Sequence, residues 1–197
     1  MIWVPGAYNA AEDFLRAGFA AAVARRGLSL DLEFVDLELR FWGDRGALEE
    51  LRGSVILPLR AAGIAVWLAG ISLGGLLALD FAASYAGDLA GLCLFAPYPG
   101  NRMLLQEIEQ APGLHNWQPG ELAETDAERR IWRYLKSRRT DAAPLYLGFG
   151  KDDRFAAGLR LLAATLPADS VDVIDGAHDW GTWALLWENF LDSRCFT

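Results

Sequence analysis

The sequence predicts an α/β fold of three layers, in which a mostly parallel β-sheet of about six strands lies between two layers of helices. Two observations lead to this prediction. Short apolar segments typical of strands recur along the 197 residues, and segments with apolar residues at helical spacing separate them. Strands that are connected through helices run parallel, because each helix returns the chain to the edge of the sheet where the previous strand began.

The expected strands and helices follow one another along the chain. Strands are expected near residues 2–6, 30–39, 63–70, 89–98, 144–150 and 170–176. Helices are expected near residues 9–27, 47–62, 73–86, 154–166 and 181–191. The segment 30–39 alternates apolar and acidic residues, so it is expected near an edge of the sheet with one solvated face. The runs 63–70 and 89–98 are almost entirely apolar, which is typical of buried strands.

One segment interrupts this alternation. Residues 99–143 carry helical patterns but no strand pattern, and the chain has no internal repeat or linker-like stretch. We therefore expect a single domain, 1–197, with a helical insertion at 99–143.

Composition excludes several classes of function. The formal net charge is -8, which argues against nucleic acid or an anionic membrane surface as the main partner. No apolar stretch approaches the roughly 20 residues of a membrane span, and no signal peptide is readable, so a cytoplasmic location is expected. Cys93 and Cys195 suggest neither a disulfide framework nor a metal cluster, and we expect no metal and no organic cofactor. The oligomeric state is left open.

A serine stands in an unusual place within the apolar run "AVWLAGISLGGLLAL". Gly70, Ser72 and Gly74 form a Gly-x-Ser-x-Gly pattern between a predicted buried strand and a predicted helix. A sharp strand-to-helix turn of this kind exposes the serine hydroxyl beyond the carboxyl end of the sheet, and it aims the N–H of Leu73 at an oxyanion. The alternative is that Ser72 only caps the helix, because serine is a common N-cap residue.

A nucleophilic serine needs a base, and the base needs a third group to orient it. The chain has two histidines. His178 follows the last predicted strand, at the same sheet edge as Ser72, whereas His115 lies in the insertion and is expected to be a solvated surface group. Asp152 and Asp153 follow the strand that ends at Gly150, so either can supply the third group.

In these residues the chain resembles the α/β-hydrolase superfamily, and in particular its small bacterial serine hydrolases and esterases. The resemblance covers nearly the whole chain and follows that family's order of nucleophile, acid and base, here Ser72, aspartate and His178. The family's three-residue step after a glycine selects Asp153, which leaves Asp152 free to cap the helix that begins near Arg154.

The resemblance also assigns the surroundings of the triad. It implies that the N–H of Ala7, in "VPGAY", is the second oxyanion donor, and that 99–143 is a lid. Two features depart from the family pattern: its first two strands are absent, and so is the usual His-Gly-Gly motif. Four aromatic residues are candidates for substrate binding: Tyr8, Tyr98, Trp117 and Trp180. For Tyr98, next to the insertion, and Trp117, within it, the alternative is a place in the lid core, and for Trp180 it is a place in the core of the last helix.

The expected function is that of a serine hydrolase that cleaves small acyl esters through a Ser-His-Asp triad and an acyl-enzyme. Thioester or lactone hydrolysis is an alternative, because the triad chemistry is common to all acyl transfers. A second alternative is a catalytically idle domain of the same fold that only binds a ligand. Such a domain is expected to have lost a member of the triad, and all three are present.

Overall fold

The computed structural model describes residues 1–35, 45–111, 114–139 and 141–193. Six parallel strands form one sheet in the order β2-β1-β3-β4-β5-β6. The strands are β1 (Ile2–Val4), β2 (Glu33–Phe34), β3 (Trp67–Ile71), β4 (Gly91–Phe95), β5 (Leu145–Gly150) and β6 (Val171–Ile174). The prediction of a parallel six-stranded sheet is therefore confirmed, and β2 lies at the edge of the sheet, as expected from its alternating pattern.

Nine α-helices lie in the described part of the chain. They are α1 (Ala11–Arg16), α2 (Phe19–Arg25), α3 (Arg45–Leu51), α4 (Leu57–Ala61), α5 (Leu73–Tyr85), α6 (Arg102–Gln110), α7 (Ala127–Ser137), α8 (Ala156–Ala163) and α9 (Trp180–Asp192). A π-helical turn, Arg52–Ile56, joins α3 to α4, and short 3₁₀ turns span Ala86–Asp88 and Ala168–Ser170. None of the helices in the described ranges is long and apolar enough to cross a membrane.

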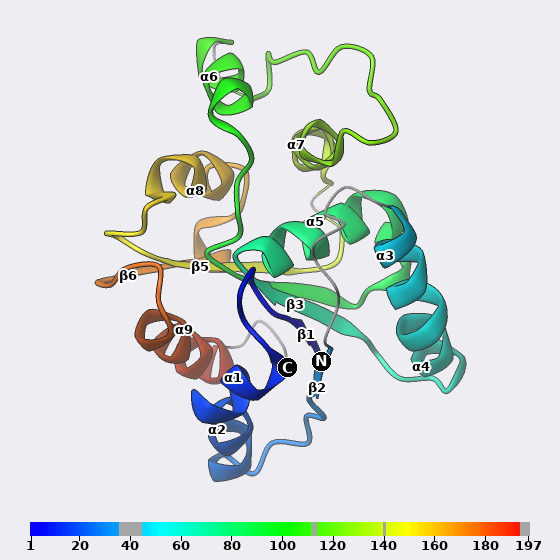
Figure 1. Ribbon diagram of the computed structural model, residues 1–197, viewed down its shortest axis with the longest axis vertical. Helices are drawn as coiled ribbons and strands as arrows, with labels where there is room; N and C mark the ends of the chain where they lie inside the picture. Colours follow the sequence, from blue (N-terminus) through cyan, green and yellow to red (C-terminus); the bar gives the residue numbers. More distant parts are fainter. Residues whose placement is uncertain (36–44, 112–113, 140, 194–197) are drawn as a thin grey trace.

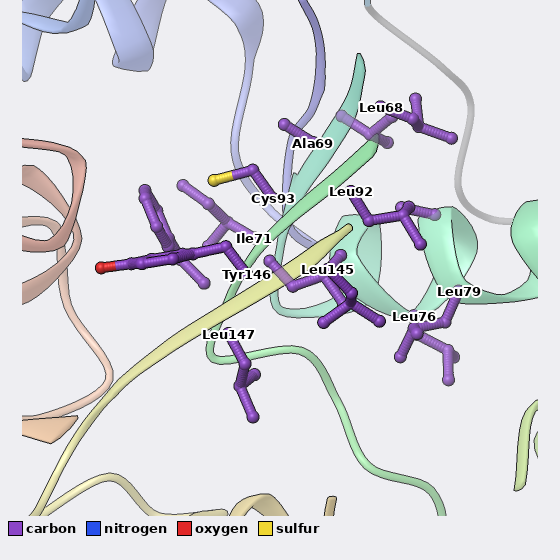
Figure 2. Close-up of a cluster of buried hydrophobic side chains, with 14 of the residues drawn as sticks. Leu68, Ala69, Ile71, Leu76, Leu79, Leu92, Cys93, Leu145, Tyr146 and Leu147 are labelled. Atoms are coloured by element: carbon purple, nitrogen blue, oxygen red, sulfur yellow. The ribbon is translucent and has the colours of Figure 1, made fainter. Parts of the chain in front are cut away.

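The helices cover both faces of the sheet, which makes the three predicted layers. Figure 1 shows α1, α2 and α9 on one face, with α5 and α8 on the other and α7 on the outer side of α5. Figure 2 shows how strand alternation divides the core. Tyr146 of β5 points away from Leu145 and Leu147, which lie on the side of α5 with Leu76. On the α9 face, Trp3 is fully buried and its ring contacts those of Phe14, Phe19, Phe95 and Trp187.

Two helices differ from the sequence prediction. The single helix expected at 9–27 is divided into α1 and α2, because Gly18 between them adopts a left-handed conformation with φ +83°. The helix expected at 47–62 is interrupted by the π-helical turn. Of the strand expected at 30–39, Glu33 and Phe34 are in β2, and its residues from 36 onward lie outside the described ranges.

The segment 99–143 is fixed to the rest of the domain by several contacts. Arg130 of α7 donates from Nε and Nη2 to the two carboxylate oxygens of Asp80 on α5, at 2.7 and 2.8 Å, and both side chains are nearly buried. Within the segment itself, Glu128 accepts from the backbone N–H of Asn101, and Trp132 donates to the carbonyl of Pro99. On its other side, α6 packs on α8, where a Cβ on Gly158 would meet Leu105 at 2.9 Å.

Candidate active site

Ser72 lies at a sharp turn between β3 and α5. Its φ of 53° and ψ of -115° place a non-glycine residue in a region that costs on the order of 1–3 kcal/mol. The backbone N–H of Ser72 donates to the carbonyl of Phe95 and its carbonyl accepts from the N–H of Tyr98, so the neighbouring strand holds the turn on both sides. The Ser72 side chain makes no capping bond to α5, which argues against the alternative that it serves only as an N-cap.

Glycines around the turn explain how the strained serine is accommodated. A Cβ on Gly70 would lie 2.4 Å from the backbone of Gly74, and a Cβ on Gly74 would lie 2.2 Å from the carbonyl oxygen of Val4. A Cβ on Gly75 would meet Pro97 at 2.8 Å. Since real Cβ atoms do not approach so closely, the Gly-x-Ser-x-Gly-Gly pattern is required for α5 to start against the ends of β1 and β3.

His178 lies in hydrogen-bond contact with both Ser72 and Asp153. The Ser72 hydroxyl lies 3.0 Å from His178 Nε2, and His178 Nδ1 lies 2.7 Å from Asp153 Oδ2. With its proton on Nδ1, the imidazole donates to Asp153 and accepts from Ser72. The structure thus brings together the three residues that the sequence selects as a triad, one each from the carboxyl ends of β3, β5 and β6.

The imidazole is enclosed by aromatic rings. Phe155 and Trp183 each meet the ring of His178 edge-on, with centroids 5.2 and 5.1 Å away. The side chain of His178 is 9% exposed and that of Asp153 is fully buried. Few solvent molecules therefore compete for the His178–Asp153 bond, which strengthens it electrostatically. Sequence reasoning missed both flanking rings, because nothing local marks Phe155 or Trp183 as neighbours of His178.

Asp153 has two hydrogen-bonding roles, and this corrects a prediction for Asp152. Asp153 Oδ1 accepts from the N–H of Phe155 at 2.8 Å, while Oδ2 accepts from His178. Helix α8 begins at Ala156, and its N-cap residue, Phe155, makes no side-chain capping bond. The expectation that Asp152 caps this helix is therefore wrong; its backbone N–H donates to the carbonyl of Gly176, and the residue is exposed.

Two glycines bring the acid and histidine loops together. A Cβ on Gly150 would lie 2.2 Å from the carbonyl oxygen of Gly176, and Gly176 has a φ of +147°, which side chains rarely allow. The side chain of Asp179 accepts from the N–H of Thr182 and so caps α9 directly after His178. Both ends of the histidine loop are therefore fixed by local structure.

The turn after β1 lies beside the serine. A Cβ on Gly6 would lie 3.3 Å from the Cβ of Ser72 and 3.3 Å from the carbonyl oxygen of Ile71. Ala7 and Tyr8 follow in this turn; both are exposed, and Tyr8 has a left-handed φ of 66°. Leu73 is the first residue of α5. The turn that contains Ala7 thus lies beside Ser72, and Leu73, the other predicted oxyanion donor, follows Ser72 in the sequence.

The predicted substrate-binding aromatics fall into two groups. Tyr98 is partly buried, and its ring contacts Phe155, which in turn contacts His178. Burial, and to a lesser degree the charge of Glu128, raises the pKa of Tyr98. Tyr8 is fully exposed in the turn beside Ser72.

The other two aromatics are packing residues. Trp117 is 1% exposed, and its indole N–H donates to Glu107 at 2.8 Å. It lies in the interior of the 99–143 segment, which fits the alternative of a core role. Trp180 is partly buried, with its ring against those of Phe14 and Trp183. It supports the ring that flanks His178.

His115 takes no part in this arrangement. It is exposed, lies in the 99–143 segment and lines a cavity formed with α7 and α8. The expectation of a surface residue is confirmed.

Comparison with known proteins gives the fold. No protein-family model matches the sequence, and neither does any curated protein. Solved structures do match: Staphylococcus aureus fluorophosphonate-binding serine hydrolase F has a TM-score of 0.66 at 14% identity, over 97% of this chain and 81% of that one. A ferulic acid esterase has a TM-score of 0.63 at 15% identity, over 100% and 84%. A monoacylglycerol lipase from Paleococcus ferrophilus has a TM-score of 0.57 at 13% identity, over 96% and 92%.

The chain has the α/β-hydrolase fold. In this chain the sheet has six parallel strands, as expected from the absence of the family's first two strands. The contact between Ser72, His178 and Asp153 is at the carboxyl edge of that sheet, where ligands bind in open α/β folds.

Proposed function

We propose that this α/β-hydrolase is a serine hydrolase that cleaves small carboxylic esters. The observation that supports the proposal is the hydrogen-bonded series Asp153–His178–Ser72, with spacings of 2.7 and 3.0 Å, built on a strained serine. These spacings are those of a nucleophile joined to its base and of a base joined to its orienting group. A ferulic acid esterase and a monoacylglycerol lipase among the structural neighbours support esters, and two S-formylglutathione hydrolases among them support thioesters as the second candidate.

The proposed reaction uses each residue in one role. His178 Nε2 accepts the Ser72 proton as the hydroxyl oxygen attacks the ester carbonyl, and the proton then passes to the leaving alcohol. Water, deprotonated by the same nitrogen, releases the acid from the acyl-enzyme. Asp153 holds the imidazole in the tautomer with its proton on Nδ1 and stabilises the imidazolium that forms.

The developing oxyanion requires donors that are already in place. We assign this role to the backbone N–H groups of Leu73 and Ala7, because Leu73 follows Ser72 in the sequence and the turn that contains Ala7 lies beside Ser72. Loss of one such donor typically costs about 10²–10³ in turnover, so the Gly6–Tyr8 turn is a sensitive part of the proposed site.

We propose that the segment 99–143 is a lid and that the preferred acyl group is short. The two helices of this segment, α6 and α7, have nine and eleven residues and are fixed to α8 and α5. Neither of these two described helices is long and apolar enough to cover an extended acyl chain. We expect kcat/KM on nitrophenyl esters to fall as the acyl group lengthens from butanoyl to dodecanoyl; a steady rise would overturn this assignment.

Labelling with a fluorophosphonate probe tests the proposed nucleophile. One adduct is expected, on Ser72, and none in the Ser72→Ala variant. Folded protein that is not labelled, or is labelled elsewhere, would overturn the proposal and favour an idle domain. A thioester and a lactone measured beside the nitrophenyl esters would show whether esters are the preferred class.

A further inference from the structure

A cavity lies away from Ser72. It has a volume of about 420 Å³ and lies between the C-terminal part of α7 and the C-terminal part of α8. Helix α8 runs from Phe155, beside His178, toward this cavity, and its eight residues rise by about 12 Å. The volume is within the range of roughly 300–1,000 Å³ that small-molecule sites occupy. The cavity is therefore a separate candidate site.

Three basic side chains line the cavity. They are His115, Lys136 and Arg138, and no aspartate or glutamate of the described ranges lines it. This is unexpected in a chain with 18 basic and 26 acidic residues. The local charge of the cavity is thus opposite in sign to that of the protein as a whole.

Lys136 and Arg138 also differ from the other partly buried basic residues. Each of the other partly buried arginines in the described ranges forms an ion pair with a carboxylate: Arg26, Arg45, Arg52, Arg129 and Arg130. Lys136 and Arg138 have no carboxylate within ion-pair distance among the described residues. They donate instead to the backbone carbonyls of Trp117 and Ala143. Partly buried charges usually have a counter-ion, so these two positions favour an anionic ligand.

The remaining lining is mostly apolar. Leu114, Leu135, Leu161 and Ala164 contribute hydrocarbon, and Thr165 contributes a hydroxyl that already donates to the carbonyl of Leu162. A ligand that fits both the cationic and the apolar lining of the cavity has one anionic end and an apolar body. Carboxylates fit the guanidinium especially well, since its N–H groups match the two carboxylate oxygens.

We propose that this cavity binds a small amphipathic carboxylate, with its charged end between Lys136 and Arg138 and its hydrocarbon against the leucines. The proposal does not depend on ester hydrolysis at Ser72, because none of the cavity residues belongs to the triad. A purely structural role for the two cations, in which they only donate to the carbonyls of Trp117 and Ala143 and complement the C-terminal end of α7, is the competing explanation.

Titration calorimetry with octanoate separates the two explanations. The protein carries Ser72→Ala, so binding is measured whether or not Ser72 is a nucleophile. We expect saturable binding at the cavity and an affinity for octanamide, which has the same length but no charge, at least about tenfold weaker. Arg138→Gln and Lys136→Gln should each weaken octanoate binding by about tenfold or more. The matched control is Arg133→Gln, which removes the same charge from an exposed position of α7 and should leave the affinity unchanged.

Three results would overturn the proposal. One is no binding of octanoate at millimolar concentration. The second is equal affinity for octanoate and octanamide. The third is equal octanoate affinity in all variants, which would mean that the ligand binds outside this cavity, for example beside Ser72. If a substitution prevents folding, the rise in melting temperature of the parent protein with octanoate, compared with octanamide, still tests the preference for charge.

Discussion

The two histidines of this chain differ in how firmly the surrounding residues hold the imidazole ring. His178 is 9% exposed, is bonded at both ring nitrogens and lies between the rings of Phe155 and Trp183. His115 is exposed and has no hydrogen bond to the described residues. The difference comes from placement, since one histidine follows a strand end where three loops meet and the other lies in an insertion. A fixed tautomer and orientation, rather than the residue type, make the proposed base.

Replacing each histidine tests this difference, and His178→Ala is expected to change kcat more than any other substitution considered. His178→Ala removes the proposed base and should lower kcat by about 10⁵ or more, as loss of the histidine does in serine proteases. His115→Ala should change kcat less than about twofold. Hydrolysis of a nitrophenyl ester is the measurement. A comparable loss in both variants would mean that the 99–143 segment supplies a group to the reaction.

The adjacent residues Asp152 and Asp153 allow a second comparison between a side chain that contacts the triad histidine and one that is exposed. Asp153→Asn keeps the shape but favours the wrong imidazole tautomer, so kcat should fall by about 10⁴. Asp152 is exposed and its side chain has no role in the triad, so Asp152→Asn should retain most activity. Steady-state kinetics with circular dichroism of both variants provides the check. A reversed pattern would assign the orienting role to Asp152.

Much of this site is local in sequence, and that part could be predicted. The strand, Gly70-x-Ser72-x-Gly74 and the following helix are consecutive, and the clashes that a Cβ would cause at those glycines impose the pattern. Asp153 follows Gly150 at a fixed step, and His178 follows β6 directly. Only two histidines had to be considered.

Other features depend on contacts between distant residues and could not be predicted. Asp80 and Arg130 are 50 positions apart, and no local pattern indicates that they pair. Trp117 was expected to bind substrate, but its indole N–H has a partner, Glu107, on the other side of its own segment. Gly18 interrupts a helical pattern, and the sequence does not distinguish a tolerated helix glycine from one that ends a helix.

The pairing of Asp80 with Arg130 allows a comparison of buried and exposed ion pairs. Asp80→Ala leaves the Arg130 guanidinium nearly buried without its carboxylate, at a cost of about 3 kcal/mol in the free energy of unfolding. Asp141→Ala removes the partner of Arg139 in the exposed part of the same segment, where solvent screens the pair, and should leave the urea midpoint nearly unchanged. Urea denaturation followed by tryptophan fluorescence measures both. Equal losses would show that the buried pair does not hold the segment on α5.

The smallest expected effect concerns pH and the contact between α6 and α7. Arg129 donates to both oxygens of Glu107, and this, with the indole N–H of Trp117, lowers the pKa of Glu107 to about 2 from 4.5. Since the folded-state pKa lies below the unfolded one, the stabilisation is complete above pH 4.5 and is lost as the pH falls from there toward 2. The side chain of Glu107 is 40% exposed, so solvent screening limits the contribution to about 1 kcal/mol.

Glu107→Gln isolates this contribution, because glutamine keeps the length of the side chain but cannot ionise. The variant should be less stable than the parent protein at pH 7, and the difference should narrow between pH 4.5 and pH 3 as the parent carboxylate takes up its proton. Glu109→Gln, on the same helix, is the matched control and should show no such narrowing. Urea midpoints at pH 7, 5, 4 and 3 provide the measurement. A difference that stays constant across this range would mean that Glu107 stabilises α6 through hydrogen bonds alone, without a contribution from its charge.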